Sequence, residues 1–354
     1  MKYICITFLF GFFFTSCTKK ITFIGHKEFM PEDEAAWNTY FSKIKPLHPL
    51  KKNKNYTLRV LKINDSRLPD LTENQYQTLY RQIEIFTEKY IGFKVKLVDA
   101  GKKDILDFFS SYNTLFQKSR FRYRIGSGIL HLNNITEWSM LENSIMKNIK
   151  DRKLKTIQNY LPDGKKAQTF EEAGQLMFDA FREKFNAIRS IRVKDDALFK
   201  EGNYALTQDY LYWTSILYEA SDADIYITNS MIFSADDAMP PYVIKRGGIT
   251  SAVTDNNIYN ELQGAIVLGL YQFISTNEII ARDRGELPEE ELENVIALLM
   301  THEMGHLMGR YDEYYDLKHS VHVAPVDINY YQWYLNIVNY KSQIPKTFNT
   351  LTRF

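Results

Sequence analysis

Cysteine is nearly absent from this chain of 354 residues, which has only Cys5 and Cys17. Residues 18–354 therefore have no cysteine with which to form a stabilising disulfide. Neither sign of charge dominates, because 44 lysines and arginines stand against 43 aspartates and glutamates. The lack of a long basic stripe argues against nucleic acid as a partner. A chain that is 45% hydrophobic instead predicts a globular protein with a substantial core.

The N-terminus lacks an apolar run long enough to cross a bilayer. Lys2 precedes an apolar stretch over residues 3–14, whereas a spanning helix needs about 20 such residues. A charged start and a short apolar run are typical of an export signal. Residues 14–17, Phe-Thr-Ser-Cys, resemble the lipobox of bacterial lipoproteins, although that family usually has leucine in place of Phe14. The resemblance implies lipidation of Cys17 and an exported protein anchored to a bacterial membrane, at the periplasmic face or the cell surface. Ordinary secretion and an uncleaved anchor are the alternatives.

The chain divides into a signal peptide at 1–17, a tether and lead-in at 18–55, and a folded domain at 56–354. The lead-in is rich in proline and ends in a lysine and asparagine cluster. Residues 56–98 predict a β-α-β unit, because a β-rich segment is followed by Thr72, with Gln75 in the capping-box position, and then by apolar residues at helical spacing. This helix should stop near Gly92, before an alternating strand.

The rest of the domain predicts an α+β fold with a mixed twisted sheet and a helical insertion at about 100–220. Helices are expected over residues 169–188, capped by Thr169, and over 207–220. Strands are expected over residues 224–228, 248–253 and 265–270, the last being apolar throughout and therefore buried on both faces.

A late helix begins with Pro288, which suits a first helical position, and continues with three glutamates that complement the positive end of the helix dipole. Its inward stripe, continued in steps of three and four residues, consists of Leu292, Val295, Leu299, His302 and His306. Two imidazoles are thus predicted where core side chains would be expected.

The sequence from His302 reads His-Glu-Met-Gly-His-Leu-Met-Gly-Arg-Tyr-Asp. His302 and His306 are one helical turn apart, so both can direct a nitrogen at one metal ion, while Glu303 can reach a water at that ion. Two core histidines paired by hydrogen bonds are the plainer interpretation of the same spacing. The glutamate between the two histidines favours the other interpretation, a hydrolytic metal site.

The pattern His-Glu-x-x-His-x-x-Gly-x-x-Asp resembles the metzincin clan of zinc peptidases, in particular its snapalysin-like variants with aspartate as third ligand. The resemblance implies one catalytic Zn²⁺ held by His302, His306 and Asp312. It also implies that Glu303 is the general base and acid, that Gly309 lets the chain turn back, and that a mixed sheet lies behind the helix. Residues 56–354 would then be a metallopeptidase domain acting on peptides or proteins.

The clan also has a methionine turn downstream of the third ligand, and no methionine follows Met308 here. The third ligand therefore stays open, the other candidates being Glu313, Asp316, His319, His322 and Asp327. Two histidines and a carboxylate are also the ligands of non-haem iron enzymes, but in those sites Glu303 would have no function. Zinc is the expected ion.

Two further interpretations remain open on the sequence alone. Residues 247–252 predict either a plain hairpin strand or a sheet edge on which an extended peptide pairs. A lipoprotein that binds a glycan or a protein without turnover is the alternative function, since 14% of the residues are aromatic and aromatic surfaces suit such partners. Such a binder has no need of the glutamate between the histidines.

Overall fold

The computed structural model describes residues 55–105, 107–108, 111, 135–193, 196–197, 207–209, 223–233, 242, 244–252, 264–309, 320–321, 325 and 328–340. The predicted signal peptide and the tether up to residue 54 lie outside the described residues. Buried hydrophobic side chains from Tyr56 to Ile337 form one cluster. Among the described residues, no helix combines the length and the apolar character needed to cross a membrane.

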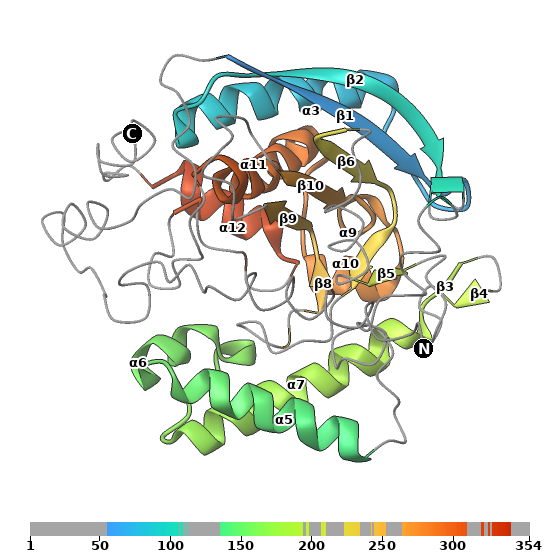
Figure 1. The fold of residues 1–354 in the computed structure, drawn as a ribbon. Helices are drawn as coiled ribbons and strands as arrows, with labels where there is room; N and C mark the ends of the chain where they lie inside the picture. Colours follow the sequence, from blue (N-terminus) through green and yellow to red (C-terminus); the bar gives the residue numbers. More distant parts are fainter. Residues whose placement is uncertain are drawn as a thin grey trace, which may run out of the picture.

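A five-stranded sheet forms the centre of the molecule, in the order β2, β1, β6, β10, β9 (Figure 1). The bounds in that order are Val95–Asp104, Tyr56–Asn64, Ile225–Thr228, Gly264–Gly269 and Gly248–Ala252. The first four strands are parallel, and β9 pairs antiparallel with β10. The prediction of an α+β fold with a mixed sheet is confirmed at this level.

The β-α-β unit predicted near the start of the domain is confirmed. Thr72 caps α3 (Glu73–Phe86), and the side chain of Gln75 completes the capping box. A π-helical turn, η1 (Thr87–Ile91), extends α3 and ends at Gly92, whose φ of 82° is a left-handed conformation that glycine adopts without strain. The chain then enters β2 parallel to β1.

The neighbouring strands β6 and β10 are buried on both faces, as the apolar run at 265–270 predicts for β10. All four residues of β6 are buried, and the side chains of residues 265–268 in β10 are at most 2% exposed. Parallel strands covered on both faces are continuously apolar because neither face meets water. These strands form the framework on which the site is built.

The helical insertion consists of α5 (Ile135–Lys150), α6 (Leu154–Ile157) and α7 (Phe170–Ser190), with short 3₁₀ turns at Gln158–Tyr160 and Pro162–Gly164. Figure 1 shows α5 and α7 together at the end of the molecule opposite β1 and β2. Trp138 of α5 meets Phe178, Phe181 and Phe185 of α7 edge-on. Thr169 caps α7 as predicted, by accepting a hydrogen bond from the Glu172 amide.

The helix predicted from residue 207 is wrong at its start, because Thr207–Asp209 forms the short strand β5, which pairs with β7 (Met231–Phe233). Residues 210–222 lie outside the described residues. Cross-strand pairing, which no local pattern encodes, overrides the helical spacing there. The remaining short strands are β3 (Arg192–Val193), β4 (Asp196–Ala197) and β8 (Lys245–Arg246).

The late helix, α11 (Leu292–Met304), begins after a 3₁₀ turn, η5 (Glu289–Glu291). Pro288 is the N-cap residue of that 3₁₀ turn. The prediction that Pro288 is the first residue of the α-helix is therefore wrong, because α11 begins about one turn later, at Leu292. All residues from Val295 to Met304 are buried, not only the predicted stripe. The cause is that α11 contacts α3, β9, β10 and α12 (Tyr330–Val338) on different sides.

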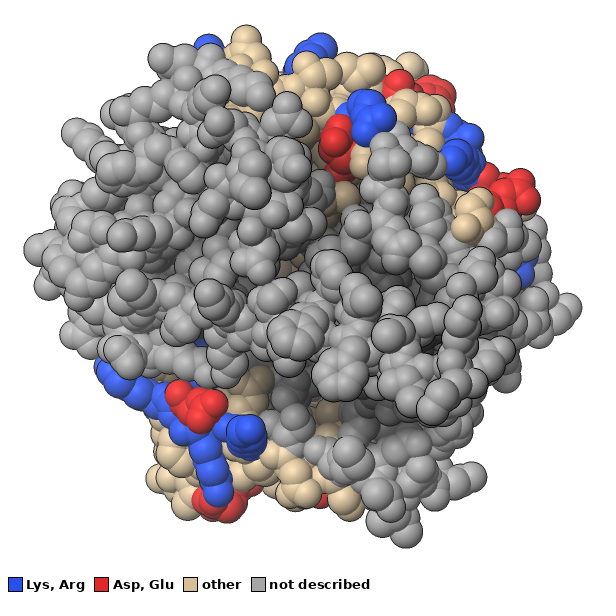
Figure 2. Space-filling view, viewed as in Figure 1, with Lys and Arg blue, Asp and Glu red and all other residues tan. Residues whose placement is uncertain are grey.

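Two short helices, α9 (Tyr271–Ile274) and α10 (Glu278–Arg284), follow β10. Asp283 of α10 forms a buried ion pair with Lys245 of β8, with 2.5 Å between the charged atoms. At the described surface, acidic and basic side chains lie beside one another on the face shown in Figure 2. Ion pairs that involve exposed lysines of the described residues include those of Lys96 with Glu84 and of Lys102 with Asp70.

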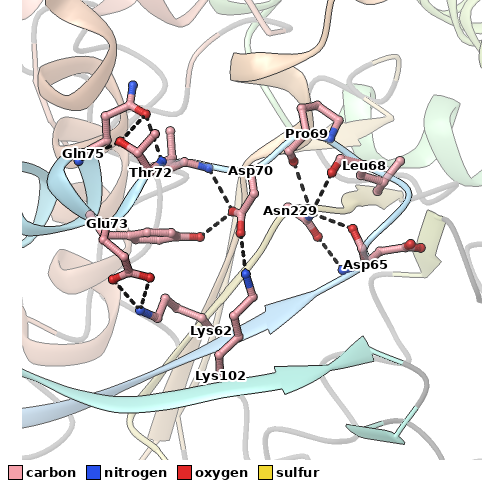
Figure 3. Close-up of polar contacts among 12 residues, drawn as sticks. Lys62, Asp65, Leu68, Pro69, Asp70, Thr72, Glu73, Gln75, Lys102 and Asn229 are labelled. Atoms are coloured by element: carbon pink, nitrogen blue, oxygen red, sulfur yellow. Dashed lines mark hydrogen bonds and ion pairs between the residues drawn. The ribbon is translucent and has the colours of Figure 1, made fainter.

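A polar network closes the carboxyl end of β1 (Figure 3). Lys62, with a side chain only 6% exposed, donates to Glu73 and Asp99. Burial alone would lower the pKa of Lys62, but these hydrogen bonds outweigh it and raise that pKa. Asn229, after β6, donates to the carbonyls of Asp65, Leu68 and Pro69 and accepts from the Asp65 amide. The network joins the loops after β1 and β6.

Candidate metal centre and general base

Two imidazoles converge at the end of α11. The helix continues into a π-helical turn, η6 (Gly305–Gly309), which contains His306. The Nε2 atoms of His302 and His306 lie 3.1 Å apart, and the two rings are perpendicular with centroids 4.6 Å apart. The structure therefore brings both predicted histidine ligands together through the same ring atom.

A hydrogen bond to the Val321 carbonyl orients the ring of His302. Its Nδ1 lies 2.6 Å from the carbonyl oxygen of Val321, which can only accept, so Nδ1 carries the hydrogen. In a neutral imidazole this leaves Nε2 with a lone pair directed at His306. Trp333 of α12 meets the ring edge-on, with centroids 6.3 Å apart. A backbone carbonyl that holds the second ring nitrogen is the usual support of a metal-binding histidine.

The donor set fits zinc. Two nitrogens at about 2.0–2.1 Å from a tetrahedral zinc ion are about 3.3 Å apart, close to the separation of the two Nε2 atoms. The same separation also suits a hydrogen bond in which His306 donates and His302 accepts, which is the plainer interpretation of the pair. Metal content distinguishes the two arrangements.

The predicted third ligand, Asp312, lies outside the described residues, as do the five alternatives between Glu313 and Asp327. Within the described ranges, no group of three histidine, cysteine, aspartate or glutamate side chains is placed to hold a metal. The chain does return to the site after the helix, because Val321 contacts His302. The predicted lipidation site, Cys17, also lies outside the described residues.

Glu303 is buried, with 6% of its surface exposed, and a buried carboxylate costs free energy unless it is hydrogen-bonded. Its Oε2 accepts a hydrogen bond of 2.6 Å from the hydroxyl of Thr250 in β9. The Thr250 hydroxyl also lies 3.1 Å from the backbone oxygen of Glu303. Among the described residues, Thr250 is the one hydrogen-bond donor to this carboxylate. The predicted general base is thus joined to the sheet.

The glycine pair before Thr250 allows α11 to approach β9 closely. A Cβ atom at Gly247 would lie 2.6 Å from the hydroxyl oxygen of Tyr330, and one at Gly248 would lie 2.6 Å from Cγ of Glu303. Both distances are shorter than real Cβ contacts, so a larger residue would displace its neighbours. The Thr250–Glu303 contact was not predicted, although two adjacent glycines in a strand are a signal of close backbone approach.

Strand β9 ends the five-stranded sheet among the described residues, and it lies against α11. Gly248–Ala252 forms a strand that pairs antiparallel with β10, which agrees with both sequence interpretations of residues 247–252, the plain hairpin strand and the sheet edge.

Comparisons of the chain with protein-family models, curated proteins and solved structures gave no match. Function is therefore inferred from the chemistry of the site.

Proposed function

We propose that this protein is a zinc-dependent peptidase that hydrolyses peptide bonds with Glu303 as general base and acid. The observation that carries the proposal is the convergence of the His302 and His306 Nε2 atoms, 3.1 Å apart, at the end of a buried helix that also carries Glu303. A buried carboxylate costs free energy, and a role in proton transfer accounts for its presence beside two imidazoles.

His302, His306 and Asp312 would hold the zinc ion. When bound, zinc supplies positive charge that polarises the scissile carbonyl and makes a nearby water more acidic. Glu303 accepts a proton from this water as the water oxygen forms a bond to the carbonyl carbon. The carbon–nitrogen bond then breaks, and Glu303 returns the proton to the departing amine nitrogen. The products are a carboxylic acid and an amine, and the glutamate ends in its initial state.

An extended peptide is the substrate that this site suits. Among the described residues, strand β9 lies at the edge of the sheet beside α11, and a peptide added to that edge would pass the helix that carries the histidines. Main-chain pairing of this kind recognises the backbone of a peptide more than its side chains.

The resemblance to snapalysin-like metzincins also belongs to this proposal. The antiparallel strand β9 next to the histidine-bearing helix, and the return of the chain at Val321, support it. The resemblance implies Asp312 as the third ligand. If Asp312→Ala retained zinc and activity, the third ligand would be another of the candidates between Glu313 and Asp327.

We also propose that the mature protein is a lipoprotein anchored through Cys17. When the chain is expressed with its own signal in a bacterium, wild type should partition with membranes. Cys17→Ser should move to the soluble fraction, whereas Cys5→Ser, within the apolar run, is the matched control and should stay with the membrane. A Cys17→Ser protein that remains membrane-bound would rule out the anchor.

The direct test of the proposed function combines metal analysis with an assay of peptide cleavage. Purified protein should contain about one zinc ion per chain and cleave a denatured protein or a mixed peptide library. A chelator should abolish cleavage, and added zinc should restore it. Full zinc occupancy without cleavage of any peptide would favour the alternative of a non-catalytic lipoprotein that binds a glycan or a protein partner.

A further inference from the structure

We propose that Thr250 is a positioning residue for Glu303, an inference that rests on the proposed peptidase function. The hydroxyl of Thr250 lies 2.6 Å from Oε2 of Glu303 and 3.1 Å from the Glu303 backbone oxygen. A hydroxyl has one hydrogen, and a bond to an ionised carboxylate is shorter and stronger than one to a neutral carbonyl. The hydrogen therefore belongs to the carboxylate.

Gly248 forms the other half of this support. Residues two apart in a strand have side chains on the same face, so Gly248 and Thr250 both face Glu303. The Oε1 atom and the Cγ atom of Glu303 lie where a side chain at position 248 would begin. We call Gly248 and Thr250 together the Glu303 cradle. Glycine leaves the space for the carboxylate, and threonine holds one of its oxygens.

The cradle leaves Oε1 for chemistry. Thr250 donates to Oε2, and no other described residue donates to the carboxylate, so Oε1, which lies against Gly248, keeps its lone pairs, and the proposal assigns proton acceptance to it. A glutamate has three rotatable side-chain bonds and must otherwise be held in place by the solvent and by packing. The hydrogen bond from the sheet selects one rotamer before the substrate arrives, which lowers the cost of reaching the reactive geometry.

The effect of losing the hydroxyl should appear in kcat. Thr250 supports the proton acceptor and does not hold the peptide by its side chain, so KM should stay within about twofold of wild type. Misplacement of a catalytic group by about 1 Å costs up to roughly a hundredfold in rate, and a carboxylate without its support should lose about ten- to a hundredfold in kcat.

The experiment compares three threonine variants in the zinc-loaded full-length protein. Thr250→Val keeps the branched shape and removes the hydroxyl, and Thr250→Ser keeps the hydroxyl. The matched control is Thr228→Val, which removes a buried threonine hydroxyl from β6, two strands away. We expect the loss in kcat for Thr250→Val alone, rescue to within about threefold of wild type in Thr250→Ser, and unchanged zinc content throughout.

A second measurement needs no turnover. In a double-mutant cycle of metal-free protein unfolded with urea, the midpoint shift of Thr250→Val with Glu303→Met should differ from the sum of the two single shifts, because either change alone removes the hydrogen bond. If Thr250→Val fails to fold, Thr250→Ala replaces it in both experiments.

The two hypotheses fail in different ways. If wild type cleaves peptides while Thr250→Val matches it in kcat, or if the unfolding shifts are additive, the positioning role of Thr250 is wrong and the peptidase function stands. If zinc-loaded wild type cleaves no peptide, the proposed function is wrong, and the catalytic role of Thr250 is wrong with it.

Discussion

Two buried polar regions of this molecule differ in how their groups are satisfied. At the carboxyl end of β1, opposite charges and complementary dipoles meet: the Lys62 ammonium lies 2.9 Å from Asp99, and one side chain, Asn229, bonds four backbone groups (Figure 3). At the end of α11, two groups of the same kind meet, because His302 and His306 face each other through identical ring nitrogens.

The difference distinguishes a polar network that stabilises the fold from a histidine pair that we propose binds a metal ion. Every group of the β1 network has a partner of opposite character within the chain, so the network is complete and stabilises the loops. With Nδ1 of His302 donating to Val321, Nε2 of His302 is an acceptor, so Nε2 of His306 either donates a hydrogen to it or shares a cation with it. We propose that the histidine pair binds a metal ion, and the predictions below test this contrast.

The largest effect is expected from His302→Ala. This change removes a ligand together with the Val321 hydrogen bond that orients it, so zinc content should fall from about one ion per chain to about a tenth or less. Cleavage should fall to the level of chelator-treated wild type. Metal analysis and the peptide assay on the same sample check this result. Full zinc occupancy in the variant would show that the two imidazoles are an ordinary hydrogen-bonded pair.

Asn229→Ala, in the network at the end of β1, should instead lower stability without affecting zinc content or cleavage. This change leaves backbone groups of the buried residues Asp65 and Leu68 without their partner, which should lower the free energy of unfolding by about 2–4 kcal/mol. Zinc content and cleavage below the unfolding transition should be unchanged. Urea unfolding measures the loss, with the exposed Gln175→Ala as control, expected within about 0.5 kcal/mol of wild type. A loss of zinc in Asn229→Ala would contradict the separation of the two regions.

The smallest effect is expected at Lys184 of α7, where burial disfavours the charged form of the side chain. Burial, and then the nearby Lys245, lower the pKa of Lys184 to about 8. Between pH 8 and about 10.5, the folded protein therefore binds fewer protons here than the unfolded chain, so the free energy of unfolding should rise with pH in that window. The penalty is fully present below pH 8.

A Lys184→Met variant tests this difference. Its free energy of unfolding should exceed that of wild type at pH 7 by about 1–2 kcal/mol, a value discounted for partial exposure, and the gap should close by about pH 10.5. Urea unfolding between pH 7 and about 10.5 measures the difference in free energy of unfolding between Lys184→Met and wild type. Lys155→Met, at an exposed position, is the control for a general change of charge. A gap that stays constant with pH would contradict the lowered pKa.

The sequence predicts those parts of the fold that depend on local patterns. The capping box of Thr72 and Gln75, the stop at Gly92 and the buried run at 265–270 each depend on neighbours within a few residues, and all are present. Spacing also places His302 and His306 together, because one helical turn separates them.

The features that the sequence does not predict depend on contacts between distant segments. The hydrogen bond from Thr250 to Glu303 joins residues 53 positions apart, and the one from His302 to Val321 joins residues 19 apart. Likewise, β5 begins where helical spacing predicts a helix, because pairing with β7 decides the conformation. Neither propensity nor periodicity contains this information.

Glu303→Gln separates catalysis from metal binding and is the most direct test of the central claim. The substitution preserves size and the helix but removes the proton acceptor, so zinc content and thermal stability should stay near wild type. Peptide cleavage should fall by at least about two orders of magnitude, the usual contribution of general acid–base catalysis. Unchanged cleavage by the zinc-loaded variant would contradict the proposed peptidase mechanism.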